Sequence, residues 1–122
     1  MENITRGGQF IVKETLAENI FTPEDFSDEQ IMMRDSVKEF VDREIWPYKI
    51  RFEQKDYAFT EESMRKAGEL GFLGVAVPEE FGGLGMGFVS TMLTCDYISG
   101  ASGSFSTAFG AHTGIGTMPI TL

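Results

Sequence analysis

The 122-residue sequence contains one cysteine and one histidine, and these scarcities exclude several kinds of site. Because Cys95 is alone, the chain has neither an internal disulfide framework nor a thiolate metal cluster. His112 cannot form a metal site by itself, and no nucleophile can be paired with it from the sequence. We therefore predict that this chain carries no catalytic residue and no metal site of its own.

Basic residues are also scarce, with 10 Lys and Arg against 19 Asp and Glu, for a net charge of −9. This balance argues against nucleic acid or an anionic membrane as the main partner, because both select basic surfaces. The opening stretch MENITRGGQF lacks a basic segment followed by a long apolar run, so no signal peptide is evident. The expected location is the reducing cytoplasm.

Charge is nearly absent from the last part of the chain, where Asp96 is the only charged residue between Phe88 and Leu122. A membrane span is not expected there, because Ser, Thr and Gly make the segment too polar for the hydrocarbon core of a bilayer. We expect protein to cover this surface instead. In a chain this short, the cover must come partly from elsewhere.

No stretch has a convincing strand pattern, and the predicted fold is all-α, a bundle of about four to five helices. Residues 1–26 show no sustained helical period and are interpreted as an extended arm laid over the domain that follows, residues 27–122. Ser27 begins the first helix with a capping box in which Gln30 reaches back, and Pro47 ends or kinks that helix.

The second helix is predicted to begin at Thr60 as N-cap and to end at Gly71 in a left-handed conformation. A glycine-rich loop follows, and a third helix is predicted from about Phe88 to Ile98. The run SGASGS should break it, and a fourth helix should begin near Phe105.

The run GGLGMGFVS invites comparison with the dinucleotide-binding fingerprint G-x-G-x-x-G. Starting from Gly85 and Gly87, however, the third glycine position is occupied by Ser90. The run also follows a helix and a loop, whereas the fingerprint follows a strand. We interpret it as a tight connection between helices.

The order of these elements resembles the N-terminal α-domain of the acyl-CoA dehydrogenase family. The segment AGELGFLGVAVPEEFGGLGMG and the closing GAHTGIGTMPI carry the resemblance, which spans about Ser27 to Leu122. The arm from Gly8 to Phe26 and the GAH of the last helix more closely resemble the very-long-chain branch.

The resemblance implies a flavin enzyme that uses FAD to remove an α-proton and a β-hydride from an acyl-CoA thioester. Its electrons would pass to an electron-transferring flavoprotein, and it would be a homo-oligomer. In this family the catalytic base and most FAD contacts lie in a β-domain, a C-terminal helical domain and a neighbouring subunit. This segment is therefore expected to be inactive alone.

The closing helix is unusually rich in small residues, although each interior glycine costs about 1 kcal/mol relative to alanine. At helical spacing, one face collects Thr107, Gly110, Ala111, Gly114 and Met118. We predict that these residues line an acyl pocket and favour long chains. The alternative, given equal weight, is that the glycines only permit close helix packing.

Two other functions stay open at this point. One is a related flavin oxidase or monooxygenase on the same scaffold, and the other is a stand-alone helical interaction module.

Overall fold

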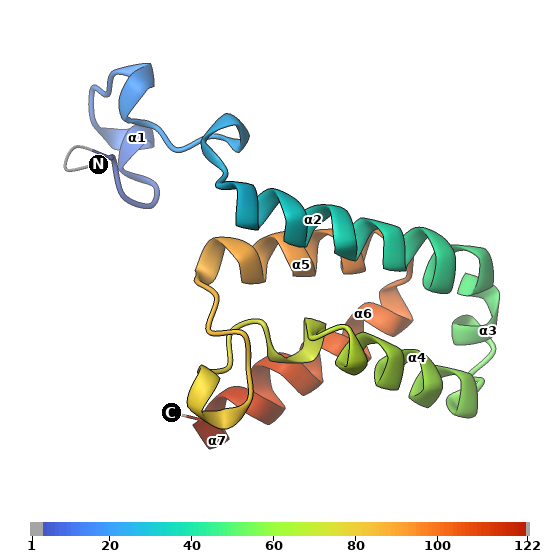
Figure 1. Cartoon of the computed structure of the whole chain (residues 1–122). Helices are drawn as coiled ribbons and strands as arrows, with labels where there is room; N and C mark the ends of the chain where they lie inside the picture. Colours follow the sequence, from blue (N-terminus) through green and yellow to red (C-terminus); the bar gives the residue numbers. More distant parts are fainter. Residues whose placement is uncertain (1–3, 122) are drawn as a thin grey trace.

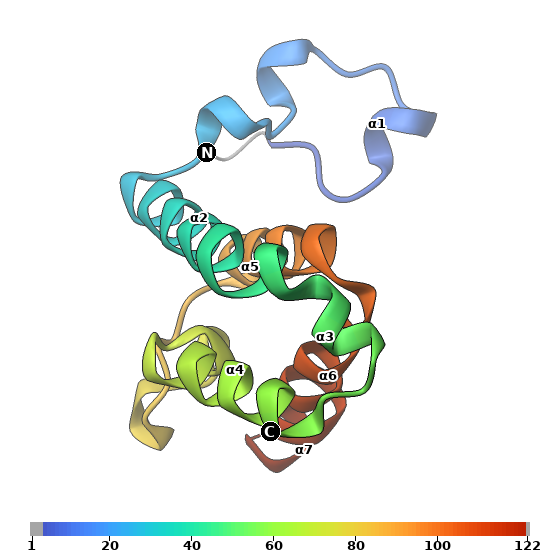
Figure 2. The ribbon, with the colours of Figure 1, turned by 90° about the vertical axis from the view of Figure 1, so that its right-hand side faces the viewer.

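The computed structural model describes residues 4–121, and within that range every regular element is helical, as predicted (Figure 1). α2 and α5 lie side by side in one layer, while α4 and the α6–α7 segment form a second layer below them (Figures 1 and 2). None of the helices between residues 4 and 121 combines the length and apolar character needed to cross a bilayer. The helices in chain order are α1 (Gln9–Val12), α2 (Asp28–Phe40), α3 (Lys49–Glu53), α4 (Tyr57–Glu69), α5 (Phe88–Ala101), α6 (Gly103–Gly110) and α7 (Met118–Thr121).

The start of α2 follows the predicted capping box. The Gln30 amide donates to Ser27 Oγ at 3.2 Å, and the Ser27 amide donates to Gln30 Oε1 at 3.0 Å. After Phe40 the chain continues as a π-helical turn, Val41–Ile45, and then as a tighter 3₁₀ turn, Trp46–Tyr48, that contains Pro47. The α-helix thus ends ahead of Pro47, which cannot supply a backbone donor to an interior turn.

The predicted start of the second helix at Thr60 is wrong. α4 begins one turn earlier, and its N-cap is Asp56, whose Oδ1 accepts from the Phe59 amide at 3.1 Å. The Thr60 hydroxyl instead donates to the Asp56 carbonyl from inside the helix. Aspartate caps at least as well as threonine, and the earlier start brings Phe59 against the core. The left-handed Gly71, with φ +84°, is confirmed.

The break between the last two predicted helices lies within the run SGASGS, as expected, but the earlier helix ends three residues after the predicted Ile98. α5 runs through Gly100 to Ala101, and Ser102, in an extended conformation, caps α6 by accepting from the Phe105 amide at 3.2 Å. Continuing the helix buries Ala101, which offsets the weak helix propensity of Gly100. The glycines of this run were therefore weaker breaks than Ser102.

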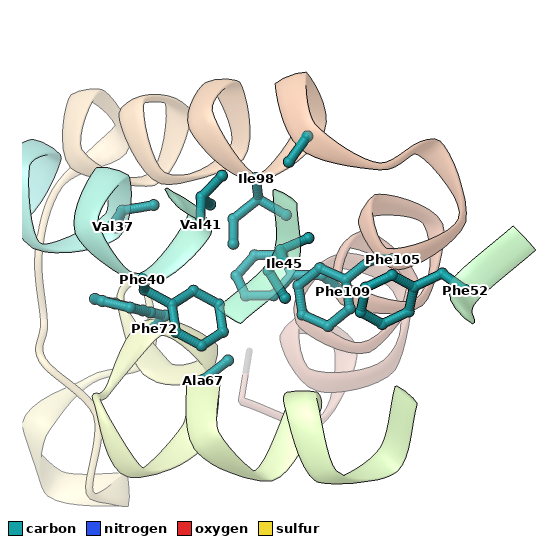
Figure 3. Packing of buried hydrophobic residues seen from close by; sticks show 11 residues of the cluster. Val37, Phe40, Val41, Ile45, Phe52, Ala67, Phe72, Ile98, Phe105 and Phe109 are labelled. Atoms are coloured by element: carbon teal, nitrogen blue, oxygen red, sulfur yellow. The ribbon is translucent and has the colours of Figure 1, made fainter. Parts of the chain in front are cut away.

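The core lies between the two layers and is rich in aromatic rings (Figure 3). Phe105 is fully buried at its centre, with ring centroids 5.3 Å from Phe52 and 6.4 Å from both Phe40 and Phe109. α2 and the turn after it contribute Val37, Val41 and Ile45, while α5 contributes Ile98. The last helix, which comprises α6, the turn after it and α7 (Gly103–Thr121), is thereby anchored in the core through Phe105 and Phe109.

The prediction that the N-terminal arm lies over the domain is wrong for the residues that the structure describes. Residues 4–25 form three short helical turns that stand off the bundle beyond the start of α2 (Figures 1 and 2), while Phe26, the last residue of the arm, borders α5. The arm instead bonds to itself, because the Thr5 amide donates to the Asn19 carbonyl at 2.8 Å. The face of the last helix that carries the glycines is not covered by it.

Candidate functional site

An apolar pocket of about 190 Å³ lies between α5, the loop after α4 and the last helix. None of its lining residues is charged. They are Phe72, Leu73, Val75, Ala76 and Val77 of the loop, Thr91, Met92, Thr94 and Cys95 of α5, and Phe109, Gly110, Thr113, Gly114 and Met118 of the last helix.

The last helix changes its winding where it borders this pocket. α6 is followed without a break by a π-helical turn, Ala111–Thr117, and then by α7. The Thr117 hydroxyl donates to the carbonyl of His112, five residues earlier, at 2.8 Å. π-Helical turns are rare and often occur at functional sites.

Two glycines of this helix, Gly110 and Gly114, border open space. A Cβ atom added at Gly110 or at Gly114 would meet nothing within 4 Å. Neither glycine has a left-handed backbone, so neither is required by local geometry. Close packing inside this chain therefore does not explain them.

The loop that closes the other side of the pocket is held by its own backbone. The Leu84 amide donates to the Gly74 carbonyl at 2.9 Å, and the Met86 amide donates to the Val75 carbonyl at 2.8 Å. A Cβ atom at Gly83 would lie 2.0 Å from the Val77 carbonyl oxygen, so this position accepts glycine alone. The backbone of the predicted glycine-rich loop is thus held in place by its own hydrogen bonds and by a close approach that requires glycine.

Of the five predicted pocket residues, Gly110, Gly114 and Met118 line this pocket. Thr107 and Ala111 do not line it, and both are exposed. The Thr107 hydroxyl donates to the Gly103 carbonyl at 2.9 Å, within its own helix. The pocket therefore borders only part of the predicted helix face.

Sequence reasoning missed other residues that line the pocket. Phe109 and Thr113 lie four residues apart on the last helix, and Met92 and Cys95 are three apart on α5. Their spacing is typical of helix faces that meet a neighbour. No sequence pattern, however, indicates which faces of α5 and the last helix oppose each other.

The pocket is suited to an apolar group. The hydroxyls of Thr91, Thr94 and Thr113 all donate to carbonyls of their own helices, at 3.3, 2.9 and 2.9 Å. These hydroxyl protons are therefore not available to an occupant of the pocket. Burial raises the pKa of the Cys95 thiol, which keeps it neutral and unreactive at pH 7.

This pocket does not fit FAD. Ligand pockets for drug-sized molecules span about 300–1,000 Å³, more than the 190 Å³ found here. The lining also offers neither a cation nor a free hydroxyl proton for a pyrophosphate. Among residues 4–121 no group of three or more His, Cys, Asp or Glu is placed to hold a metal.

The geometry thus defines the class of protein: an all-α domain with an apolar, uncharged pocket beside its last helix. Residues 27–122 match the family described as acyl-CoA dehydrogenase, N-terminal domain, and the chain belongs to that family.

Three similar proteins place the chain within that family. A probable acyl-CoA dehydrogenase of Bacillus subtilis (strain 168) is 38% identical over 118 residues, which are 97% of this chain and 20% of that protein. A mitochondrial isovaleryl-CoA dehydrogenase of Solanum tuberosum is 35% identical over 91 residues, which are 74% of this chain and 22% of that protein. The crystal structure of an acyl-CoA dehydrogenase complexed with FAD from Bacillus anthracis has a TM-score of 0.85 and 42% identity, with 97% of this chain and 20% of that chain covered.

The chain spans about a fifth of the length of these relatives. Since 118 residues are 20% of the B. subtilis protein, that protein has about 590 residues, and the same arithmetic gives about 410 for the isovaleryl-CoA dehydrogenase. Isovaleryl-CoA and glutaryl-CoA dehydrogenases are both among the relatives, so the comparisons do not support the predicted place in the very-long-chain branch.

Proposed function

We propose that the complete polypeptide is an FAD-dependent acyl-CoA dehydrogenase that removes an α-proton and a β-hydride from a fatty acyl-CoA thioester. In this proposal the present domain supplies one wall of the tunnel for the acyl tail. The flavin and the catalytic base would be held by other parts of the polypeptide, so the isolated domain would be inactive. The support for this proposal is family membership together with the pocket's lack of charge and free donors.

The observation that carries the tunnel-wall part is the open space over Gly110 and Gly114. Two helix-weakening glycines at an apolar pocket are expected where an occupant from outside the domain must fit. Each buried CH₂ contributes roughly 0.8 kcal/mol, so room for three methylenes amounts to about 2.4 kcal/mol, or some 60-fold in affinity. Small changes on this wall should therefore change which acyl chains are accepted.

The reaction is tested on the complete protein loaded with FAD and mixed anaerobically with a series of acyl-CoAs. We expect bleaching of the flavin absorbance and formation of the corresponding enoyl-CoA. Turnover should then require an electron-transferring flavoprotein or an artificial acceptor. Turnover driven by oxygen would instead identify an oxidase or monooxygenase, and no bleaching with any acyl-CoA would contradict the proposal.

The wall is tested with Gly110→Leu in the complete protein. A leucine side chain would fill the open space, so kcat/KM for the longest accepted acyl-CoA should fall at least tenfold relative to the shortest. Gly100→Leu is the matched control, because Gly100 also borders open space but lies outside the pocket. Equal chain-length profiles for the two variants would discard the tunnel-wall role.

Other features of the proposal concern the complete protein. The partners would be the remaining domains of the same chain, an electron-transferring flavoprotein and further copies in a homo-oligomer. A cytoplasmic location agrees with the single free cysteine.

A further inference from the structure

The N-terminal arm carries an apolar surface that the domain does not use. Residues 5–19, here called the arm loop, present Phe10, Ile11, Val12 and Leu16 to solvent, with exposed fractions of 51, 75, 80 and 64%. α1, at the tip of this loop, buries none of its residues. Four large apolar side chains so close together are expected at a binding surface.

The arm loop has a defined backbone. Its ends are joined by the bond from the Thr5 amide to the Asn19 carbonyl, and the Lys13 amide donates to the Gln9 carbonyl at 2.9 Å. Gly7, with φ +55°, makes the turn that leads into α1. Closed surface loops of this size usually pack on their own side chains. Here the apolar side chains are exposed instead. The loop itself stands off the bundle (Figure 2).

The comparisons show that relatives of different length share different amounts of this chain. Residues 27–122 make up the shared family domain, which starts after the arm. A match of 118 residues must include most of the arm, whereas the 91-residue match to the isovaleryl-CoA dehydrogenase is no longer than that domain. The two relatives whose matches must include most of the arm have about 590 residues, some 180 more than the isovaleryl-CoA dehydrogenase.

We propose that the arm loop docks through Phe10, Ile11, Val12 and Leu16 onto a region of the complete chain that the longer relatives possess and the shorter ones lack. The arm and the additional region occur together because each covers an apolar surface of the other. This docking goes beyond the proposed dehydrogenation, and its test does not depend on enzymatic activity.

The test uses the complete protein with a photoreactive residue in the arm loop, Val12→p-benzoylphenylalanine. After irradiation, mass spectrometry should find the cross-linked peptides in the region that aligns only with the longer relatives. Ile50→p-benzoylphenylalanine is the matched control, because Ile50 is also an exposed aliphatic residue (58%) but lies on α3, at the other end of α2 (Figure 1). It should not label that region.

A second variant tests the same contact without a probe. In the complete protein, Ile11→Ser with Val12→Ser should speed amide hydrogen exchange at least tenfold in the additional region, while Ile50→Ser should leave it unchanged. Cross-links confined to the domains shared with shorter relatives, or to a second copy of the chain, would overturn the proposal. So would the absence of cross-links, or unchanged exchange in the additional region.

Discussion

Single glycines serve opposite purposes in this domain, and the contrast lies in what surrounds each missing side chain. At Gly83 the Val77 carbonyl oxygen already occupies the place of a Cβ atom, whereas at Gly110 that place is open. The first glycine is required by the fold of the chain itself. The second weakens its helix without serving the chain's own packing.

We predict that Gly83→Ala destabilises the domain by about 1–3 kcal/mol, since the contact is with backbone that cannot move away cheaply. Urea unfolding followed by circular dichroism measures this loss. Gly100→Ala is the control, because its Cβ atom would meet nothing within 4 Å. An equal effect at both positions would contradict the close approach described here.

We predict the reverse sign for Gly110→Ala, which should stabilise the domain by up to about 1 kcal/mol through its higher helix propensity. The same unfolding experiment applies. A clear loss of stability would show that the position is crowded and would remove the main support for an occupant from outside the domain.

Asp56 shows how one side chain can set both the start of a helix and its pH dependence. The amide of Phe59 and the guanidinium of Arg51, at 2.7 Å, together hold the pKa of Asp56 below its ordinary value of 3.8. A carboxylate whose pKa is lowered in the folded state stabilises that state at pH values above the ordinary pKa. That contribution is lost as the pH falls through the lowered value.

We therefore predict that, as the pH falls below about 4, the wild type loses stability more steeply than Asp56→Asn. The asparagine can still cap α4, but its side chain cannot titrate. Thermal unfolding at a series of pH values measures the difference. Thr60→Ala, at the position where the sequence suggested the cap, should keep the wild-type pH dependence. Parallel pH profiles for the wild type and Asp56→Asn would contradict the assignment.

At the scale of elements, the sequence predicted those features that depend on neighbouring residues. The capping box at Ser27 and the left-handed Gly71 were confirmed because their partners lie within a few positions. The start of α4 and the end of α5 were misplaced because tertiary burial of Phe59 and Ala101 decided them. The two π-helical turns have no sequence pattern that would predict them.

The candidate site divides in the same way. Gly110 and Gly114 could be singled out because glycine is costly in a helix, and Met118 because it shares their spacing. Which neighbour they face depends on how α5 and the loop pack. The opposite wall, with Met92 and Cys95, therefore could not be read from the chain.

The core joins these elements through a single ring. We predict that Phe105→Ala costs about 3–5 kcal/mol, because the fully buried side chain packs among rings from α2 and α3 and from its own helix. Phe88→Ala, at a ring that is 76% exposed, should change the stability by less than about 0.5 kcal/mol. Chemical denaturation measures the free energy of unfolding of both variants relative to the wild type. Similar losses would mean that the core is not centred on Phe105.

At the scale of the whole molecule, the last third of the chain has an unbalanced surface. Asp96 is its only charged residue, yet Ile115 and Ile120 on the last helix are 82% and 85% exposed. Apolar residues at such exposure are expected where another part of a larger protein packs. The family match and the one-fifth length of this chain agree with that interpretation.

We predict that the isolated 122-residue chain self-associates as its concentration rises, and that Ile115→Ser with Ile120→Ser reduces this association. Sedimentation velocity measures both. Ile50→Ser, which changes a similarly exposed residue on α3, should leave the association unchanged. A chain that stays monomeric at all concentrations would contradict an association surface on the last helix.

The most direct test of the central claim is photolabelling of the complete, FAD-loaded protein with an acyl-CoA that carries a diazirine at the end of its tail. The account predicts labelled peptides from α5 and from the last helix, around Met92 and Met118, and loss of that label in Gly110→Leu. Label confined to parts of the protein outside this domain would contradict it.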